Sequence, residues 1–392
     1  MNSKEDELKK YLKRSTIEHN IDKKEIGLEL DTNFEALQKG RFPEKLLEET
    51  KTSGNFTNSD IMREIEKKHT EIDLQGECAL GFESVRDAMA ESFVSRDEIG
   101  SAICVYFEGK KVVDLWGGYV DGAQNHPWRA NTLCLMYSVA KSICSLSVHM
   151  LADRGQIDLE APIAEYWPEF AQNGKENIPV RWLLSHQAGL VAVDARLGPG
   201  DGLNWDRMVH ALEETIPQWE PGTKNGYHMV TFGWLVGEVI RRISGSASVG
   251  TFFKNEVVDP LGVDFFIGTP ESEDYRIADI IPPAPGSLVR TQVEPSKLTK
   301  RSLVPASEEV AGNPNSRGWR GAEIPGANGH ATARAVAKIY GAVACGGVLD
   351  DVYLFSPERV DIMREIQVQS MDEVLELETR RSLGFMHPIP DS

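Results

Sequence analysis

The chain has 392 residues, of which 41% are hydrophobic and 8% aromatic, as is typical of a globular protein with a substantial core. Its formal net charge of −18 disfavours nucleic acid and anionic membrane surfaces as partners. No apolar run approaches the length of a membrane span, and the charged segment 1–14 lacks the apolar core of a secretion signal. The five cysteines form no Cys-x-x-Cys pair and the nine histidines no metal-binding pattern, so we expect a cytoplasmic protein with reduced thiols and no metal site.

Residues 1–72 differ in composition from the rest of the chain. They are rich in Lys and Glu and contain neither Trp nor Cys. Short apolar repeats, such as Leu8 with Leu12, predict amphipathic helices. We expect a charged helical or partly disordered extension here, with a regulatory or partner-binding arm as the alternative. The remaining residues, 73–392, are predicted to form one domain.

The first elements predicted in this domain are a helix and two strands. Segment 82–93 carries its apolar residues on one helical face. Residues 101–107 and 111–117 are rich in β-branched and aromatic side chains and flank a turn at 108–110, which predicts an antiparallel hairpin. Because strands come first and helices follow, we expect an α/β or α+β fold. Its antiparallel sheet would be flanked by helices and completed by strands from both ends of the chain.

Three longer helices are predicted later in the chain. The first covers 138–154 and ends at Gly155, a typical stop signal. The second, 231–242, is apolar on nearly all sides and is therefore expected to be buried. The third covers 334–344. Long stretches rich in Pro and Gly, notably 282–326, are expected to be loops.

The first of these helices begins with Ser138-Val139-Ala140-Lys141. Positions i and i+3 of a helix face the same way, so Lys141 can lie against the Ser138 hydroxyl. A serine hydroxyl needs such a partner to act as a nucleophile, and a lysine acts as a base only if burial or nearby positive charge lowers its pKa. A serine at a helix N-terminus also lies near backbone N–H groups that suit a developing oxyanion. The alternative interpretation is an ordinary helix start with a surface lysine.

Other motifs carry less information. Residues 245–250 approach the Gly-x-Ser-x-Gly elbow with the wrong spacing, which disfavours an α/β-hydrolase. Residues 198–202 lack the strand-to-helix context of a phosphate-binding loop and are expected to be a flexible loop. The turn at 221–226 delivers Tyr227, which either carries protons beside nearby cations or packs as a core aromatic. His228 is assigned to substrate binding, with a helix-start residue as the alternative.

In chain order, four segments resemble landmarks of the penicillin-recognising serine hydrolases, which include class C β-lactamases, DD-peptidases and β-lactamase-like carboxylesterases. The matching segments are Ser-x-x-Lys at 138–141, Leu-Leu-x-His-x-x-Gly-Leu at 183–190, Pro-Gly-Thr at 221–223 followed by Tyr227, and Gly-Ala-Asn-Gly at 326–329 with Thr-Ala-Arg at 332–334. The resemblance covers roughly residues 73–386 and is closest to the esterase branch.

This resemblance implies a β-lactamase/transpeptidase-like fold, with an antiparallel sheet flanked by helices and a mostly helical subdomain. It implies that Ser138 attacks an acyl carbonyl and forms an acyl-enzyme, which water then hydrolyses. Lys141 and Tyr227 would share the proton transfers in an order left open, and the Ser138 backbone N–H would be half of the oxyanion hole. The implied substrate is a small ester or related acyl compound. No cofactor or metal is implied, and the oligomeric state is not predicted.

Two departures from the family pattern affect the expected activity. Where β-lactamases have Tyr-x-Asn, this chain has Tyr227-His228-Met229, and methionine lacks the amide hydrogen bonds of asparagine. This favours ester over β-lactam substrates. The Lys-Thr-Gly motif, or its His/Gly-rich equivalent in esterases, has no candidate before Ser392. We therefore expect a domain that lacks its C-terminal strands.

The second departure leaves catalysis open. The strand that carries the third motif normally supplies one oxyanion N–H, and losing one such donor costs about 100- to 1,000-fold in rate. The alternative function is therefore a truncated or decayed hydrolase that acts as a non-catalytic binding protein.

Overall fold

The described part of the chain, residues 73–96, 98–282 and 294–390, begins with a three-stranded antiparallel sheet. These residues belong to the second of two units, Met1–Glu71 and Ile72–Ser392, so the helices predicted within 1–72 lie outside the described residues. In the computed structural model the strands pair in the order β1–β3–β2, with bounds Gln75–Cys78 (β1), Gly100–Phe107 (β2) and Lys110–Gly118 (β3).

The predicted hairpin is confirmed as β2 and β3. Its two turn residues, Glu108 and Gly109, have φ angles of 47° and 74°. A two-residue turn with positive φ at both positions matches the twist of the flanking strands, which explains why a glycine stands at the second position.

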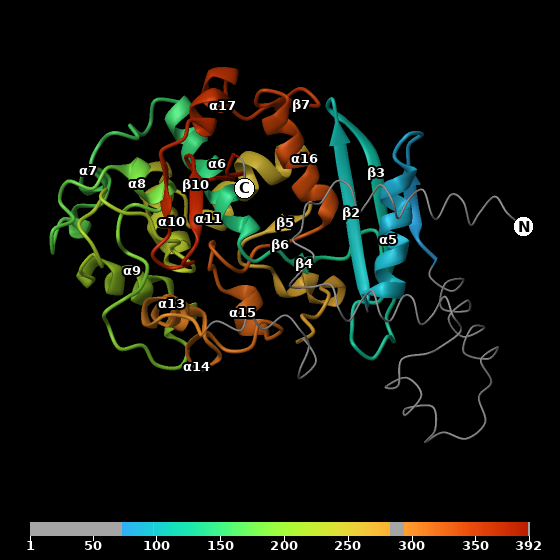
Figure 1. Ribbon diagram of the computed structural model, residues 1–392, viewed down its shortest axis with the longest axis horizontal. Coiled ribbons are helices and arrows are strands. Elements are labelled where there is room, and N and C mark those ends of the chain that lie inside the picture. Colours follow the sequence, from blue (N-terminus) through green and yellow to red (C-terminus); the bar gives the residue numbers. More distant parts are fainter. Residues whose placement is uncertain (1–72, 97, 283–293, 391–392) are drawn as a thin grey trace, which may run out of the picture. The chain divides into compact units, whose positions relative to one another are not determined.

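Helices cover both faces of this sheet, α5 (Glu83–Ser95) on one side and α16 (Ala333–Ala344) on the other (Figure 1). Alternation along β3 determines which residues face each helix. Leu115 is fully buried in the apolar cluster beneath α5. Its neighbour Asp114 points the other way and accepts hydrogen bonds from Arg334 of α16, at 2.8 and 3.0 Å.

The main core lies in the helical region around α6 (Val139–Asp153) and α10 (Thr231–Ser244), which pack against each other. Both helices were predicted close to these bounds. The shorter helices are α7 (Ile163–Tyr166), α8 (Val180–Leu184), α9 (Trp205–Glu214), α11 (Val249–Phe253), α12 (Asp259–Leu261), α13 (Lys297–Leu303), α14 (Glu308–Ala311), α15 (Arg317–Gly321) and α17 (Pro357–Arg364). Short segments of other helix types are η1 (Pro168–Phe170), η2 (Asp201–Leu203), η3 (Lys254–Val258), η4 (Glu271–Arg276) and η5 (Val304–Ala306). None of the described helices combines the length and hydropathy needed to cross a bilayer.

The expectation of loops throughout 282–326 was wrong for part of this segment, because α13, α14 and α15 lie within it. These helices are too short for apolar periodicity to reveal. Local caps mark two of them: the Ser296 side chain accepts from Thr299 N, and the Ser316 side chain accepts from Trp319 N.

The remaining strands form three small sheets. One has the order β4–β6–β5, one pairs β7 with β8, and one has the order β11–β10–β9. Their bounds are Cys134–Leu135 (β4), Phe265–Phe266 (β5), His330–Ala331 (β6), Val348–Leu349 (β7), Val352–Tyr353 (β8), Val368–Met371 (β9), Glu378–Arg381 (β10) and Met386–His387 (β11). Within the described residues, β9–β11 pair with one another rather than completing the β1–β3–β2 sheet, contrary to the expectation. The buried side chains of β10 bond instead to the turn that carries Tyr227, as described below.

Candidate active site

Ser138 stands where β4 leads into α6. Tyr137, directly before it, has a φ of 43°, a left-handed conformation that is uncommon for an aromatic residue and that bends the chain sharply. Ser138 is the N-cap of α6, yet its side chain caps no backbone N–H, so the exposed hydroxyl is free for other partners. Among the described residues its backbone N–H donates to no other group, which suits an oxyanion donor.

The side chain of Lys141 ends among three oxygen atoms. Its Nζ lies 2.6 Å from the carbonyl oxygens of Met229 and Gly326 and 3.1 Å from Ser138 Oγ. Burial, with a smaller contribution from the charge of Arg381, lowers the pKa of Lys141 to about 7. A neutral amine can donate its two N–H groups to the two carbonyls and direct its lone pair at the Ser138 hydroxyl. The amine is thus placed to take the serine proton.

Tyr227 completes the group. Lys141 Nζ lies 4.9 Å from the Tyr227 ring centroid. Burial raises the pKa of Tyr227 above its usual value of 10, and interaction with the nearby Ser138 hydroxyl opposes this rise. At neutral pH the phenol therefore holds its proton and is a donor, whereas Lys141 is the better acceptor. The structure brings the three predicted catalytic residues together.

The segment that follows α8 holds the Tyr227 turn in place. His186 has a φ of 62°, and its Nδ1 accepts a hydrogen bond from His228 N at 3.1 Å. Its carbonyl oxygen accepts from Gly226 N at 3.0 Å, and its ring centroid lies 5.0 Å from that of Tyr227. The Leu-Leu-x-His-x-x-Gly-Leu pattern thus supplies a support for the turn that carries Tyr227, a role that sequence reasoning missed.

His228 is fully buried behind this turn. Its Nδ1 donates to the Gly226 carbonyl oxygen at 2.8 Å, and its Nε2 accepts from Leu190 N at 3.1 Å, so the partners define a neutral ring. Burial lowers the pKa of His228 to about 4, in agreement with a neutral ring. With both nitrogens engaged by backbone groups, the geometry favours a supporting role. Substrate binding by His228 stays a prediction.

The Gly326 carbonyl reaches Lys141 because its loop lies directly against α10. A Cβ atom at Gly233 of α10 would lie 2.2 Å from Gly326 N, so no side chain fits between them. Asn328 holds the loop from within: its side chain is buried, donates to two backbone carbonyls and accepts from Ile324 N at 2.8 Å. The Gly-Ala-Asn-Gly segment therefore places a backbone acceptor, not a side chain, in the site.

We expect Gly233→Ala to lower the free energy of unfolding by about 1–3 kcal/mol, because the added methyl must displace the Gly326 loop. Ester hydrolysis is expected to fall as well, since the displaced carbonyl no longer meets Lys141. Urea denaturation and p-nitrophenyl acetate hydrolysis measure both effects. Gly198→Ala is the control, because a Cβ there meets nothing within 4 Å. Unchanged stability of Gly233→Ala would contradict this close contact.

A buried ion pair that the sequence did not indicate lies behind Tyr227. Arg381 of β10 and Asp372, just after β9, are 2% and 0% exposed, and Arg381 Nη2 lies 2.7 Å from Asp372 Oδ2. Arg381 Cζ lies 5.2 Å from the Tyr227 ring centroid. The local sequence Glu-Thr-Arg-Arg is typical of an exposed polar strand, so no local signal pointed to this pair.

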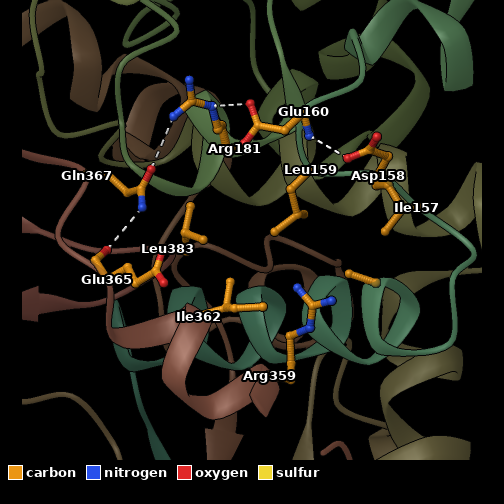
Figure 2. Close-up of a pocket in the computed structure, with 11 residues that line it drawn as sticks. Ile157, Asp158, Leu159, Glu160, Arg181, Arg359, Ile362, Glu365, Gln367 and Leu383 are labelled. Atoms are coloured by element: carbon orange, nitrogen blue, oxygen red, sulfur yellow. Dashed lines mark hydrogen bonds and ion pairs between the residues drawn. The ribbon is translucent and has the colours of Figure 1, made fainter.

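A cavity of about 320 Å³ lies away from this group of residues, bordered by α17 and the C-terminal end of α6 (Figure 2). Arg181 spans one wall, with Nε 2.9 Å from Glu160 Oε2 and Nη1 donating to Gln367 Oε1 at 3.4 Å, and Arg359 lies on the opposite wall. The lining includes neither Ser138 nor its partners. None of its lining residues is a serine, threonine or cysteine, so this cavity offers no candidate nucleophile of its own.

Comparison with known proteins matches residues 83–387 of the chain to the family model described as Beta-lactamase. The chain belongs to the beta-lactamase family. The esterase/beta-lactamase LipL of Mycobacterium tuberculosis is 35% identical over 298 residues, which cover 71% of this chain and 66% of LipL. The crystal structure of a family VIII carboxylesterase has 40% identity and a TM-score of 0.75, covering 81% of this chain and 84% of that one. A penicillin-binding protein homologue from Caulobacter crescentus has 34% identity and a TM-score of 0.72, covering 81% of this chain and 84% of that one.

These likenesses confirm the β-lactamase/transpeptidase-like fold and the relation to the esterase branch. Relatives of this beta-lactamase family member include proteins named as esterases and β-lactamases. The aligned segments cover 66% of LipL and 50% of a β-lactamase from Escherichia coli, so the chain spans less than two-thirds of these curated relatives.

Proposed function

We propose that the protein is a serine hydrolase that cleaves small carboxylic esters through an acyl-enzyme on Ser138. The observation that carries this proposal is the Lys141 amine, which is buried, has a pKa of about 7 and lies 3.1 Å from Ser138 Oγ. A surface lysine would be protonated at neutral pH and would activate nothing. The names of the relatives, esterase and carboxylesterase among them, support the substrate class.

In the proposed acylation step, Lys141 takes the Ser138 proton as Oγ attacks the ester carbonyl carbon. The carbonyl oxygen becomes an oxyanion, to which the Ser138 backbone N–H donates. The leaving alkoxide takes the phenolic proton of Tyr227, and the Lys141 ammonium returns a proton to the phenolate. In deacylation a water molecule gives one proton to the Lys141 amine while its oxygen attacks the acyl carbon. Ser138 Oγ then leaves and regains that proton.

Labelling with a fluorophosphonate tests this proposal directly. Intact-mass measurement is expected to show one adduct on the purified chain and none on Ser138→Ala. Absence of an adduct on folded wild-type protein would overturn the proposal. That outcome would favour the alternative, a decayed hydrolase that binds a partner without catalysis.

Esters are expected to be better substrates than β-lactams. Met229 gives its backbone carbonyl to Lys141, while its side chain packs against the apolar core and offers no amide. We expect kcat/KM for p-nitrophenyl acetate to exceed that for nitrocefin by about 100-fold or more. Met229→Asn, which creates Tyr-x-Asn, is expected to reduce the ratio of kcat/KM for p-nitrophenyl acetate to kcat/KM for nitrocefin. Brisk nitrocefin turnover by the wild-type chain would contradict this preference.

The thiols bear on the compartment in which the protein works. All five cysteines, Cys78, Cys104, Cys134, Cys144 and Cys345, are free. Unpaired thiols are typical of the reducing cytosol, so we place the protein in the cytoplasm.

A further inference from the structure

The turn that carries Tyr227 is fastened to the β9–β10 hairpin by side chains. Asn225 Nδ2 donates to Ser370 Oγ at 2.6 Å, and Thr379 Oγ1 donates to Asn225 Oδ1 at 3.1 Å. Tyr227 N donates to Asp372 Oδ1 at 3.0 Å. These three bonds fix the backbone of the turn, so the hairpin determines where the tyrosine lies.

Neutral hydrogen bonds would be sufficient for this anchoring, yet the hairpin also buries a full ion pair. Asp372 Oδ2 lies 2.7 Å from Arg381 Nη2, and Asp372 Oδ1 also accepts from Val374 N and Leu375 N at 2.9 Å. Burying two charges is costly, and an apolar pair of similar volume often holds a fold as well or better. The presence of the charges calls for a reason beyond packing.

The position of the guanidinium supplies that reason. Two basic side chains lie near the Tyr227 ring, with Lys141 Nζ 4.9 Å and Arg381 Cζ 5.2 Å from its centroid. Lys141 changes charge during the proposed reaction, whereas an arginine keeps its charge throughout. Arg381 is therefore the permanent positive charge beside the phenol.

We propose that Arg381, held by Asp372, is a positioning residue that fixes the Tyr227 ring beside Ser138 and stabilises the phenolate formed when Tyr227 protonates the leaving alkoxide. This inference rests on the proposed ester hydrolysis. In that step the phenolic O–H bond breaks, its proton passes to the alkoxide oxygen, and negative charge remains on the phenol oxygen. A fixed cation next to the ring lowers the free energy of this charge-separated state.

The groups that face Tyr227 agree with this role. They are the Ser138 hydroxyl and Lys141 from α6, the neutral ring of His186 after α8, and the Arg381–Asp372 pair from the hairpin. Arg381 lowers the pKa of the phenol and Asp372 raises it, with the arginine the stronger of the two. Burial is the main cause of the lowered pKa of Lys141, and Arg381 lowers that pKa as well, which favours the neutral amine.

The test compares two esters of the same acid. An alkyl ester such as ethyl butyrate leaves as a strongly basic alkoxide that needs a proton, whereas p-nitrophenyl butyrate leaves as a stable phenolate. The double variant Arg381→Met with Asp372→Asn removes both charges, so no lone buried charge remains to unfold the protein. We expect kcat for the ethyl ester to fall about 10- to 100-fold and kcat for the p-nitrophenyl ester to change much less. Arg381→Lys should retain most of the ethyl ester activity, and Arg380→Met on the same strand should retain all of it.

A second measurement does not depend on turnover. The ultraviolet absorbance of tyrosinate, taken as the difference between each protein and its Tyr227→Phe version, follows ionisation of this phenol alone. We expect it to titrate at higher pH in the double variant than in the wild type. Unchanged titration, or equal loss of both ester activities, would overturn the role of Arg381. A wild-type chain that titrates as expected but cleaves neither ester would instead overturn the proposed hydrolysis.

Discussion

Ser138→Ala is expected to lower kcat for p-nitrophenyl butyrate by about 1,000-fold or more while the protein stays folded. The loss is large because Lys141 Nζ then faces no hydroxyl, its other two oxygen contacts being the carbonyls of Met229 and Gly326. Folding is spared because the exposed Ser138 side chain caps no N–H of α6. Steady-state kinetics and a thermal melt measure the two quantities.

Ser142→Ala is the matched control for this experiment, because Ser142 lies one helical turn further along α6 and outside the reacting group. It is expected to keep wild-type kinetics. Residual activity above half of the wild-type value in Ser138→Ala would remove Ser138 as the nucleophile.

Lys141→Met is expected to lower kcat/KM by about 100- to 10,000-fold, the range of a general base. Methionine fills a similar volume but accepts no proton. In the wild type only the neutral amine is active, and its pKa is about 7. The value of kcat/KM should therefore rise about tenfold per pH unit below pH 7 and level off above it. We call this rise the pH–rate limb, and the variant should lose it. A pH–rate profile of both proteins checks the result.

The same shift predicts a pH dependence of stability. The pKa of Lys141 falls from 10.5 to about 7 on folding, so between these values the unfolded chain binds more protons than the folded one. The free energy of unfolding should therefore rise with pH across this window, and Lys141→Met should remove that contribution.

Lys175→Met is the matched control for the pH–rate experiment. Lys175 is fully buried, and burial lowers its pKa to about 8. Its Nζ donates to the carbonyls of Glu213 and Thr215, so it bonds to carbonyls as Lys141 does but has no serine beside it. We expect Lys175→Met to keep the pH–rate limb. Loss of that limb in Lys175→Met, or its survival in Lys141→Met, would remove Lys141 as the base.

The parts of the site that could be predicted depend on short-range geometry. Ser138 and Lys141 are one helical turn apart, and the hairpin of β2 and β3 follows from its two turn residues. The carbonyls that hold Lys141 come from residues 88 and 185 positions away in the chain. Any residue type carries a backbone carbonyl, so no composition or spacing could indicate them. The burial of Arg381 and Asp372 could not be predicted for a related reason. Their segment has the sequence of a polar, exposed strand, and only tertiary packing buries it beside Tyr227.

The protonation state of Lys141, whose Nζ lies among three oxygen atoms, depends on the segments that pack over it. A large share of its amine is neutral near pH 7 only while the Met229 and Gly326 segments stay closed over it and exclude water. If either segment opens, hydration returns the pKa of the amine toward its ordinary value of 10.5. The amine is then protonated at neutral pH and can no longer accept the serine proton. A local opening far short of global unfolding would therefore inactivate the site. On gentle heating, activity should fail before helical structure does, and cooling should restore both.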